Sequence, residues 1–161
     1  MAIHAYPETY LNDAMNNLGD MLDYAVNDCG YDADDFFDRF IISGVAGFFE
    51  KGSPKYTVGL SGPELASELS YRTQGERLNQ VASDDIDKSP EYWAGWIPAY
   101  YQWHSSERFS DMMSYHETQA ENSRWERIAV NALHVLPLDA SSPLYSAPAS
   151  FACLGLQQRQ R

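Results

Sequence analysis

Apolar residues recur at helical spacing along most of this chain, and that period restricts the possible fold more than any other feature. Between Pro7 and Asn27 they fall at i, i+3, i+4 and i+7 positions and line one face of a helix. The members of this stripe are Leu11, Ala14, Met15, Leu18, Leu22, Ala25 and Val26. Polar Asp13, Asn16 and Asp20 lie on the opposite face. The segment is therefore predicted to be an amphipathic helix that packs against a core.

Two further helices are predicted in the first half of the chain. One begins at Asp32, whose carboxylate can accept hydrogen bonds from free backbone N–H groups, and ends at Gly52. Gly44 and Gly47 lie inside it, and we expect them to permit close approach of a neighbouring helix. The next begins with the capping box of Ser61 (S-x-x-E) and ends near residue 75.

Three more helices are predicted in the second half. Ser89-Pro90-Glu91 is a strong start signal, with a cap, a proline at the first position and an acid in the first turn. A short helix follows Ser106, and the last periodic segment spans about 119–136.

These segments predict an all-α fold, a compact bundle of about six helices. Residues 53–60 read as an extended connection or one short strand, and residues 76–88 as an acidic internal loop. We expect residues 1–136 to form a single helical domain. Residues 137–161 lack a period and are predicted to be a loose, irregular C-terminal tail.

The formal net charge of −12 is unevenly placed along the sequence. Residues 1–38 hold nine acids and no Lys or Arg, whereas residues 39–161 hold 14 acids and 11 bases. This balance argues against ordinary binding of phosphate backbones. No stretch approaches 18 apolar residues, and the N-terminal sequence lacks the pattern of a secretory signal. Cys29 and Cys153 lie outside any CxxC spacing, so we expect reduced thiols and a cytoplasmic location in a bacterial host cell.

No arrangement of residues identifies a catalytic chemistry. The four histidines lie in four different segments, and the Asp-rich run at 28–38 lacks the glycine and terminal glutamate of a calcium-binding loop. We therefore expect no metal site, no cofactor and no catalytic residue. The aromatic helix at 90–104 has the composition of a base-stacking platform, but it lacks a basic groove, which favours a role in the core. The SGPELASELS segment resembles the first helix of a helix-turn-helix, but too few cations follow it for DNA reading.

Several short segments together carry a resemblance to a known family. They are LGDMLDYAVND at 18–28, SGVA at 43–46, FEKGSPKY at 49–56, GLSG at 59–62, YWAGW at 92–96 and YYQW at 100–103. Over roughly residues 5–110 the chain resembles an uncharacterised family of small acidic bacterial and mobile-element proteins. Longer relatives carry a C-terminal helix-turn-helix, which residues 118–161 do not resemble. The mobile-element context implies a regulator of a toxin-like neighbour or a phage anti-defence protein, including anti-CRISPR types.

The leading hypothesis is a non-enzymatic acidic interaction protein that binds and inhibits or regulates a basic nucleic-acid-handling partner, either a protein or a ribonucleoprotein. An acidic helical face can occupy a Lys/Arg channel and compete there with phosphates, because complementary fields speed association and select partners. The predicted contact residues are Asp13, Asp20, Asp23, Asp34, Asp35 and Asp38. Secondary candidates are Lys55, Tyr56 and Trp103.

Two other functions stay open at this point. An antitoxin-like regulatory subunit would dock through apolar surface, with exposed side chains among Phe48, Phe49, Tyr56, Phe151 and Leu154. A small enzyme would have its site near the glycine-containing segment 52–62 and the aromatic helix, and it would show a concave pocket there. The oligomeric state is not indicated by the sequence.

Overall fold

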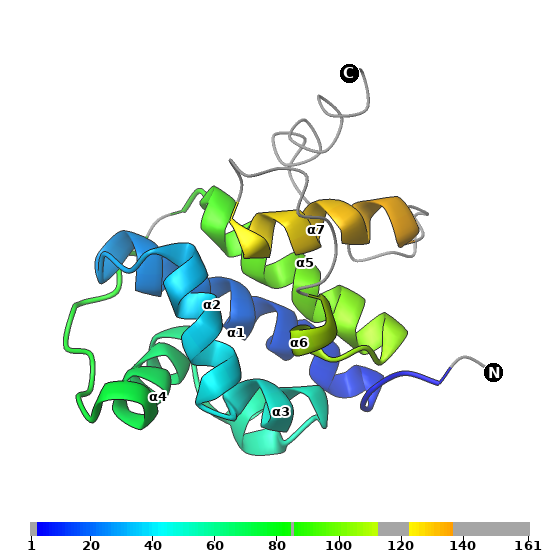
Figure 1. Ribbon diagram of the computed structural model, residues 1–161, viewed down its shortest axis with the longest axis horizontal. Helices are drawn as coiled ribbons and strands as arrows, with labels where there is room; N and C mark the ends of the chain where they lie inside the picture. The colour runs from blue at the N-terminus through cyan, green and yellow to red at the C-terminus, as the bar shows by residue number, and fades with distance from the viewer. Residues whose placement is uncertain (1–2, 85, 113–122, 137–161) are drawn as a thin grey trace, which may run out of the picture.

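The computed structural model describes residues 3–84, 86–112 and 123–136, and within these ranges every regular element is helical (Figure 1). The all-α class is thus confirmed. The α-helices are α1 (Leu11–Asp23), α2 (Ala33–Ile42), α3 (Val45–Glu50), α4 (Gly62–Gln74), α5 (Pro90–Ser105), α6 (Phe109–Met112) and α7 (Arg124–Val135). Three single turns accompany them, namely η1 (Glu8–Tyr10), η2 (Tyr24–Asp28) and η3 (Lys55–Gly59). The tail predicted at 137–161 lies outside the described residues.

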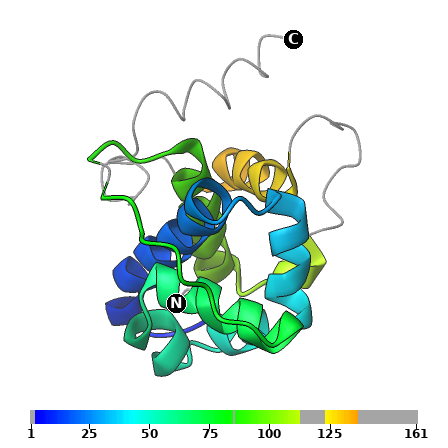
Figure 2. The same cartoon turned by 90° about the vertical axis from the view of Figure 1, so that its left-hand side faces the viewer.

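Helix α1 lies at the centre of the bundle. It packs against α5 on one side and against α4 and η3 on the other, and α7 covers the far side of α5 (Figures 1 and 2). Helix α2 connects these layers because it contacts α3, α4 and α7. The buried apolar residues of all these helices form one continuous cluster.

Aromatic rings fill the space between α2, α3, α6 and α7. Phe37 lies edge-on to Trp125 at 4.9 Å between ring centroids, and Phe40 lies edge-on to Phe109 at 5.1 Å. All four side chains are fully buried. Edge-to-face pairs at these distances stabilise the core beyond the area that they bury.

Several predicted helix boundaries are confirmed by the cap geometry. The Asp32 carboxylate accepts hydrogen bonds from the backbone N–H groups of Asp34 and Asp35 at the start of α2. Ser61 and Glu64 form the predicted capping box of α4, and Ser89 caps α5 through the N–H of Tyr92.

Three expectations about the first half are wrong. The helix predicted from Asp32 to Gly52 is two helices, because Gly44 adopts a left-handed conformation (φ 81°) and caps α3. A Cβ at Gly44 or Gly47 would meet nothing within 4 Å, so neither glycine permits close approach of another helix. Residues 53–60 are not extended throughout, because η3 forms one wide helical turn and Thr57 is buried within it.

The segment between α4 and α5 is an irregular loop, as predicted, over its described residues. It runs over the outer side of the bundle and returns from the end of α4 to the start of α5 (Figure 2). This course brings its acidic residues to the C-terminal end of α1.

Candidate binding site: an acidic pocket beside α1

The six acids predicted as one contact set lie in different surroundings. Asp20 and Asp23 line a pocket at the end of α1, whereas Asp13 is exposed on the same helix outside that pocket. Asp35 pairs with Arg39 within α2 at 3.0 Å. The structure therefore does not bring the six acids together into one face.

Asp34 and Asp38 of α2 accept hydrogen bonds from Arg124, the first residue of α7. Arg124 donates from Nη1 to Asp38 at 2.7 Å and from Nη2 to the Asp34 backbone carbonyl at 2.9 Å, and its backbone N–H donates to Asp34 Oδ1 at 2.6 Å. The hydrogen bond to Asp38 is the main cause that raises the pKa of Arg124. These two carboxylates are thus compensated by a cation from a distant part of the chain.

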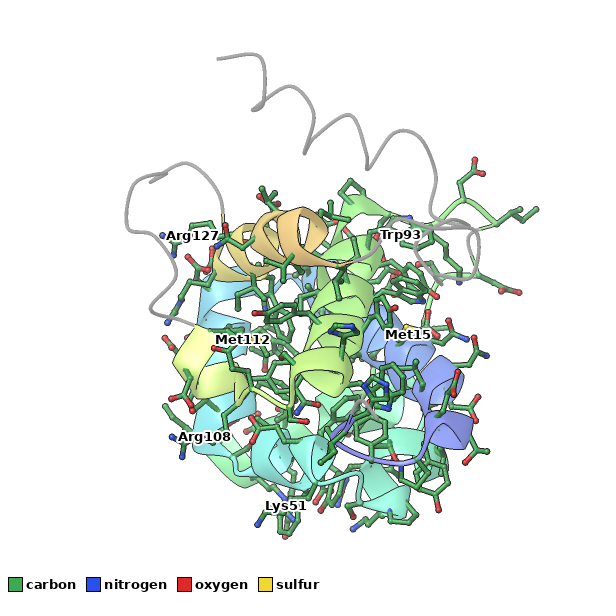
Figure 3. The ribbon with its side chains drawn as sticks, turned by 90° about the vertical axis from the view of Figure 1, so that its right-hand side faces the viewer. Met15, Lys51, Trp93, Arg108, Met112 and Arg127 are labelled. Atoms are coloured by element: carbon green, nitrogen blue, oxygen red, sulfur yellow. The ribbon has the colours of Figure 1, made fainter. Side chains whose placement is uncertain are left out.

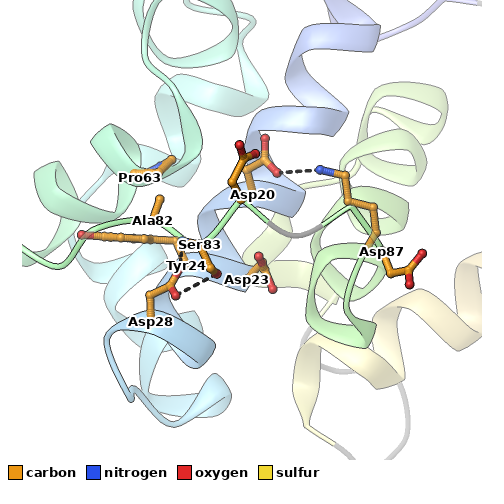
Figure 4. Close-up of a pocket in the computed structure, with 10 residues that line it drawn as sticks. Asp20, Asp23, Tyr24, Asp28, Pro63, Ala82, Ser83 and Asp87 are labelled. Carbon is orange, nitrogen blue, oxygen red and sulfur yellow. Dashed lines mark hydrogen bonds and ion pairs between the residues drawn. The ribbon is translucent and has the colours of Figure 1, made fainter.

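The pocket at the end of α1 gathers side chains from three separate segments (Figure 4). Its volume is about 220 Å³. The lining residues are Asp20, Asp23, Tyr24, Asp28, Pro63, Ala82, Ser83, Asp84, Asp87 and Lys88. Five aspartates and one lysine give this lining a formal charge of −4. We call it the acidic pocket.

The turn that follows α1 forms the inner wall of the acidic pocket. After α1 the backbone widens into the single π-helical turn η2, in which Tyr24 is buried and Asp28 is partly exposed. Such wide turns inside helices are frequent at functional sites. Here the turn places both side chains against the returning loop.

Hydrogen bonds hold the loop against this wall. Asp28 accepts from the backbone N–H of Ser83 at 3.2 Å and from its hydroxyl at 2.9 Å, and the Tyr24 hydroxyl donates to the backbone carbonyl of Gln80 at 2.7 Å. The Ser89 hydroxyl donates to Asp23 and accepts from the N–H of Tyr92. The loop wall is therefore anchored at three points while Asp84 and Asp87 stay exposed.

The electrostatics of the acidic pocket are those of crowded like charges. Burial raises the pKa of Asp20, the ammonium of Lys88 opposes that rise, and the charge of Asp23 adds to it. Burial is also the main cause that raises the pKa of Tyr24 to about 12, so the phenol is neutral at pH 7. Lys88 lies 3.7 Å from Asp20, with both side chains nearly half exposed, so this ion pair is weak.

The chemistry and size of the acidic pocket suit one organic cation. Small-molecule sites measure roughly 300–1,000 Å³, so this smaller volume matches a single side chain. Within the described residues no group of three or more His, Cys, Asp or Glu side chains has the arrangement needed to hold a metal ion. The five carboxylates and the small volume are suited to a lysine or arginine head group.

The sequence prediction found only part of this site. Asp28, Asp84 and Asp87 were not among its contact residues, although the acidic run in the 76–88 loop is visible in the sequence. What the sequence did not show is that the loop folds back onto η2.

The secondary candidates lie elsewhere. Lys55 is exposed, with its Nζ 5.1 Å from the Tyr56 ring centroid, whereas Tyr56 is buried. Trp103 is buried and donates from Nε1 to the Tyr6 carbonyl at 2.8 Å, which is a structural contact with the N-terminal segment. The segment 52–62 is largely taken up by η3 and the start of α4, and none of its residues lines the acidic pocket, although the next residue, Pro63, does.

The apolar side chains expected at a docking surface also differ in their exposure. Phe48 is 43% exposed, whereas Phe49 and Tyr56 are buried. Phe151 and Leu154 lie outside the described residues.

Comparisons of the chain with family models, with curated proteins and with solved structures give no match. No helix in the part of the chain that the structure describes is long and apolar enough to cross a membrane.

Proposed function

We propose that this chain is an acidic interaction protein that binds a basic segment of a protein partner, with one Lys or Arg side chain of the partner entering the acidic pocket. The observation that carries the proposal is the convergence of five aspartates from α1, η2 and the 76–88 loop around one small concave volume. In this role the carboxylates bind a partner and perform no reaction.

The side chain of Lys88 shows that the acidic pocket can accept a cation. Its ammonium lies at the edge of the acidic pocket, 3.7 Å from Asp20 and 4.7 Å from the Tyr92 ring centroid. A cation of the partner would displace it at small cost, because a half-exposed ion pair contributes little. Bound arginine would gain more, because its planar guanidinium can meet two carboxylates at once.

The partner class that best presents such a cation is a nucleic-acid-handling protein or ribonucleoprotein. Its Lys/Arg channel attracts phosphates, and an acidic protein competes for the same side chains. In this role the chain would inhibit its partner as an anti-defence protein of a phage or mobile element, of the anti-CRISPR type, in the host cytoplasm.

A binding titration tests the proposal. The probe is a fluorescein-labelled oligo-arginine peptide, and the readout is its Kd by fluorescence anisotropy over a series of NaCl concentrations. The double variant Asp84→Asn/Asp87→Asn removes two pocket charges from exposed positions that carry no structural hydrogen bond in the described residues. We expect its Kd to rise at least about fivefold at low salt, with a shallower salt dependence.

The matched control separates the acidic pocket from net charge. Glu8→Gln/Glu76→Gln changes the charge equally at two exposed positions outside the pocket lining. At 0.15 M NaCl its Kd should change less than about twofold, because the Debye length there is about 8 Å and more distant charges are screened. Equal weakening by both double variants would show general charge attraction and overturn the pocket proposal.

A second experiment identifies the partner. Affinity purification from a host cell that carries phage-defence and toxin systems is run at low and at high salt, with the parent and the Asp84→Asn/Asp87→Asn variant. Recovery of basic nucleic-acid machinery by the parent alone, and only at low salt, is the expected result. Recovery that neither salt nor the variant changes contradicts the proposal.

A further inference from the structure

A second surface of opposite character lies where α2, α3, η3 and α4 meet. Three large apolar side chains are exposed there, namely Ile42 (77%), Phe48 (43%) and Tyr71 (51%). Cationic side chains lie beside them. We call this surface the Arg72 patch, and it comprises Ile42, Phe48, Lys55, Tyr71, Arg72 and Arg77.

Arg72 contacts residues of three neighbouring segments at this patch. It donates from Nη2 to the Tyr56 hydroxyl at 2.7 Å and from Nη1 to the Ser43 carbonyl, next to Ile42, at 3.3 Å. Its guanidinium carbon lies 5.6 Å from the Phe48 ring centroid, and Phe48 in turn stacks on Tyr56 at 5.2 Å. The exposed aromatic ring is thereby fixed in place before any partner arrives.

The charge of the patch contrasts with that of the chain. Arg72 and Arg77 share the single carboxylate of Glu68, at 3.0 and 3.4 Å. In the described part of the chain, Lys55 has no carboxylate within ion-pair distance, and the same holds for neighbouring Lys51. Figure 3 shows Lys51 at the end of the molecule away from Trp93 and Arg127. Within the Arg72 patch itself, the three cations Lys55, Arg72 and Arg77 lie around the single carboxylate of Glu68.

We propose that the Arg72 patch docks an acidic protein segment that carries an aromatic or aliphatic anchor. The anchor would pack on Phe48, Tyr71 and Ile42, while its flanking carboxylates meet Lys55, Arg72 and Arg77. Aromatic residues and arginine are the types enriched at the centres of protein interfaces. The complementary charge sets which segments dock and how fast they associate.

The patch and the acidic pocket are separate surfaces. Pro63 lines the pocket near the start of α4, whereas Arg72 lies nine residues further along, which is about 14 Å of helix. The two surfaces have opposite charge and take opposite ligands. This inference therefore stands even if the proposal for the acidic pocket fails.

A titration followed by ¹H–¹⁵N NMR tests the inference, because it detects weak binding and locates it. One probe is a peptide that repeats Glu-Glu-Phe, and its matched probe repeats Glu-Glu-Ser. We expect the Phe peptide to shift resonances of the Arg72 patch and to bind at least about fivefold more tightly than the Ser peptide. Phe48→Ser should remove that preference, and Lys55→Gln/Arg77→Gln should weaken both peptides.

Control variants outside the Arg72 patch separate binding at this patch from a general effect of charge. Arg108→Gln removes an exposed cation just before α6 and should leave the titration unchanged, as should Asp84→Asn/Asp87→Asn in the acidic pocket. The spectra of the free variants confirm that they fold, which is expected because Phe48, Lys55 and Arg77 are exposed. Absence of binding, or binding that the patch variants do not change, overturns the inference. Equal, patch-dependent binding of oligothymidylate would assign the surface to nucleic acid instead.

Discussion

Individual glycines determine how closely α1 and α5 approach. A Cβ built on Gly95 would lie 2.5 Å from the backbone oxygen of Leu18, and one on Gly19 would lie 2.8 Å from the backbone oxygen of Tyr92. Real Cβ atoms do not tolerate such distances from backbone atoms. The two central helices therefore pack backbone to backbone at this crossing, and no rearrangement of a side chain can relieve an added methyl group.

Alanine substitutions at Gly95 and Gly47 should change the free energy of unfolding in opposite directions. Gly95→Ala should lower the free energy of unfolding by about 1–3 kcal/mol, because overpacking forces the backbones apart. Gly47→Ala lies within α3 with open space around it and should raise that free energy by roughly 0.4–1 kcal/mol, because alanine restricts the unfolded chain. Urea denaturation of both variants measures the two values. A neutral effect of Gly95→Ala would contradict the packing of α1 on α5.

The sequence alone did not distinguish these glycines. It predicted close approach at Gly44 and Gly47, because both interrupt an apolar stripe, and the structure places the close approach at Gly19, Gly62 and Gly95 instead. All glycines lower helix propensity alike. Which of them faces a neighbouring backbone depends on how two helices cross, and that information is absent from the local sequence.

At the scale of elements, helix starts were predictable because their signals are local. Asp32, Ser61 and Ser89 each cap the helix that they were expected to begin. The break at Gly44 and the helical turn η3 were not predicted. At Gly44 the backbone turns with a positive φ, and its N–H donates to the Ile41 carbonyl at 3.2 Å. The buried position of Thr57 depends on a distant contact, because Asn17 of α1 donates to the Thr57 carbonyl at 2.9 Å.

Helix α4 is joined to α2, α3 and η3 through Arg72, and Glu68 orients that arginine. The hydrogen bond from Arg72 is the main cause that lowers the pKa of Glu68 from 4.5. A carboxyl group whose folded-state pKa is depressed stabilises the fold above its unfolded pKa, and that stability is lost as the pH falls through the folded pKa.

Glu68→Gln should therefore destabilise the protein most at neutral pH. The difference in unfolding free energy between the parent and the variant should be constant from pH 7 to about 5.5 and shrink below about 4.5, as Glu68 of the parent becomes protonated. Urea denaturation at each pH measures it. Glu50→Gln serves as the control of opposite sign, because burial raises the pKa of Glu50. If the Glu68→Gln difference stays constant down to pH 3, the carboxylate does not stabilise the Arg72 contacts.

At the scale of the whole molecule, the fold pairs some of the N-terminal acids with cations and leaves others available to a partner. Residues 1–38 contain no cation, yet Arg39, Lys88 and Arg124 come from later positions to pair with Asp35, Asp20 and Asp38. The sequence therefore predicted which segment is acidic but not which acids remain available to a partner. That selection is made by contacts between acids and cations as far apart as 90 positions, as in Asp34 and Arg124.

Net repulsion among the remaining acids should make stability depend on salt. The ion pairs have N–O distances of 2.7–3.7 Å, well within one Debye length even at 0.15 M salt, so screening weakens them little. Repulsion between unpaired acids acts over longer distances and is screened strongly, because the Debye length falls from about 30 Å at 0.01 M to about 8 Å at 0.15 M. With a net charge of −12, the loss of repulsion is the larger effect.

The thermal midpoint should thus rise with NaCl between 0.01 and 0.15 M. In a chain of this size each kcal/mol moves Tm by about 2–4 °C, so an increase of a few degrees is expected by differential scanning calorimetry. The triple variant Glu8→Gln/Asp13→Asn/Glu76→Gln removes three exposed charges without removing an ion pair of the described residues, and its increase should be smaller because less repulsion is left to screen. A midpoint that falls with salt would mean that the paired acids, and not the unpaired ones, dominate the electrostatic free energy of the fold. The acidic pocket would then have little uncompensated charge with which to attract a basic partner.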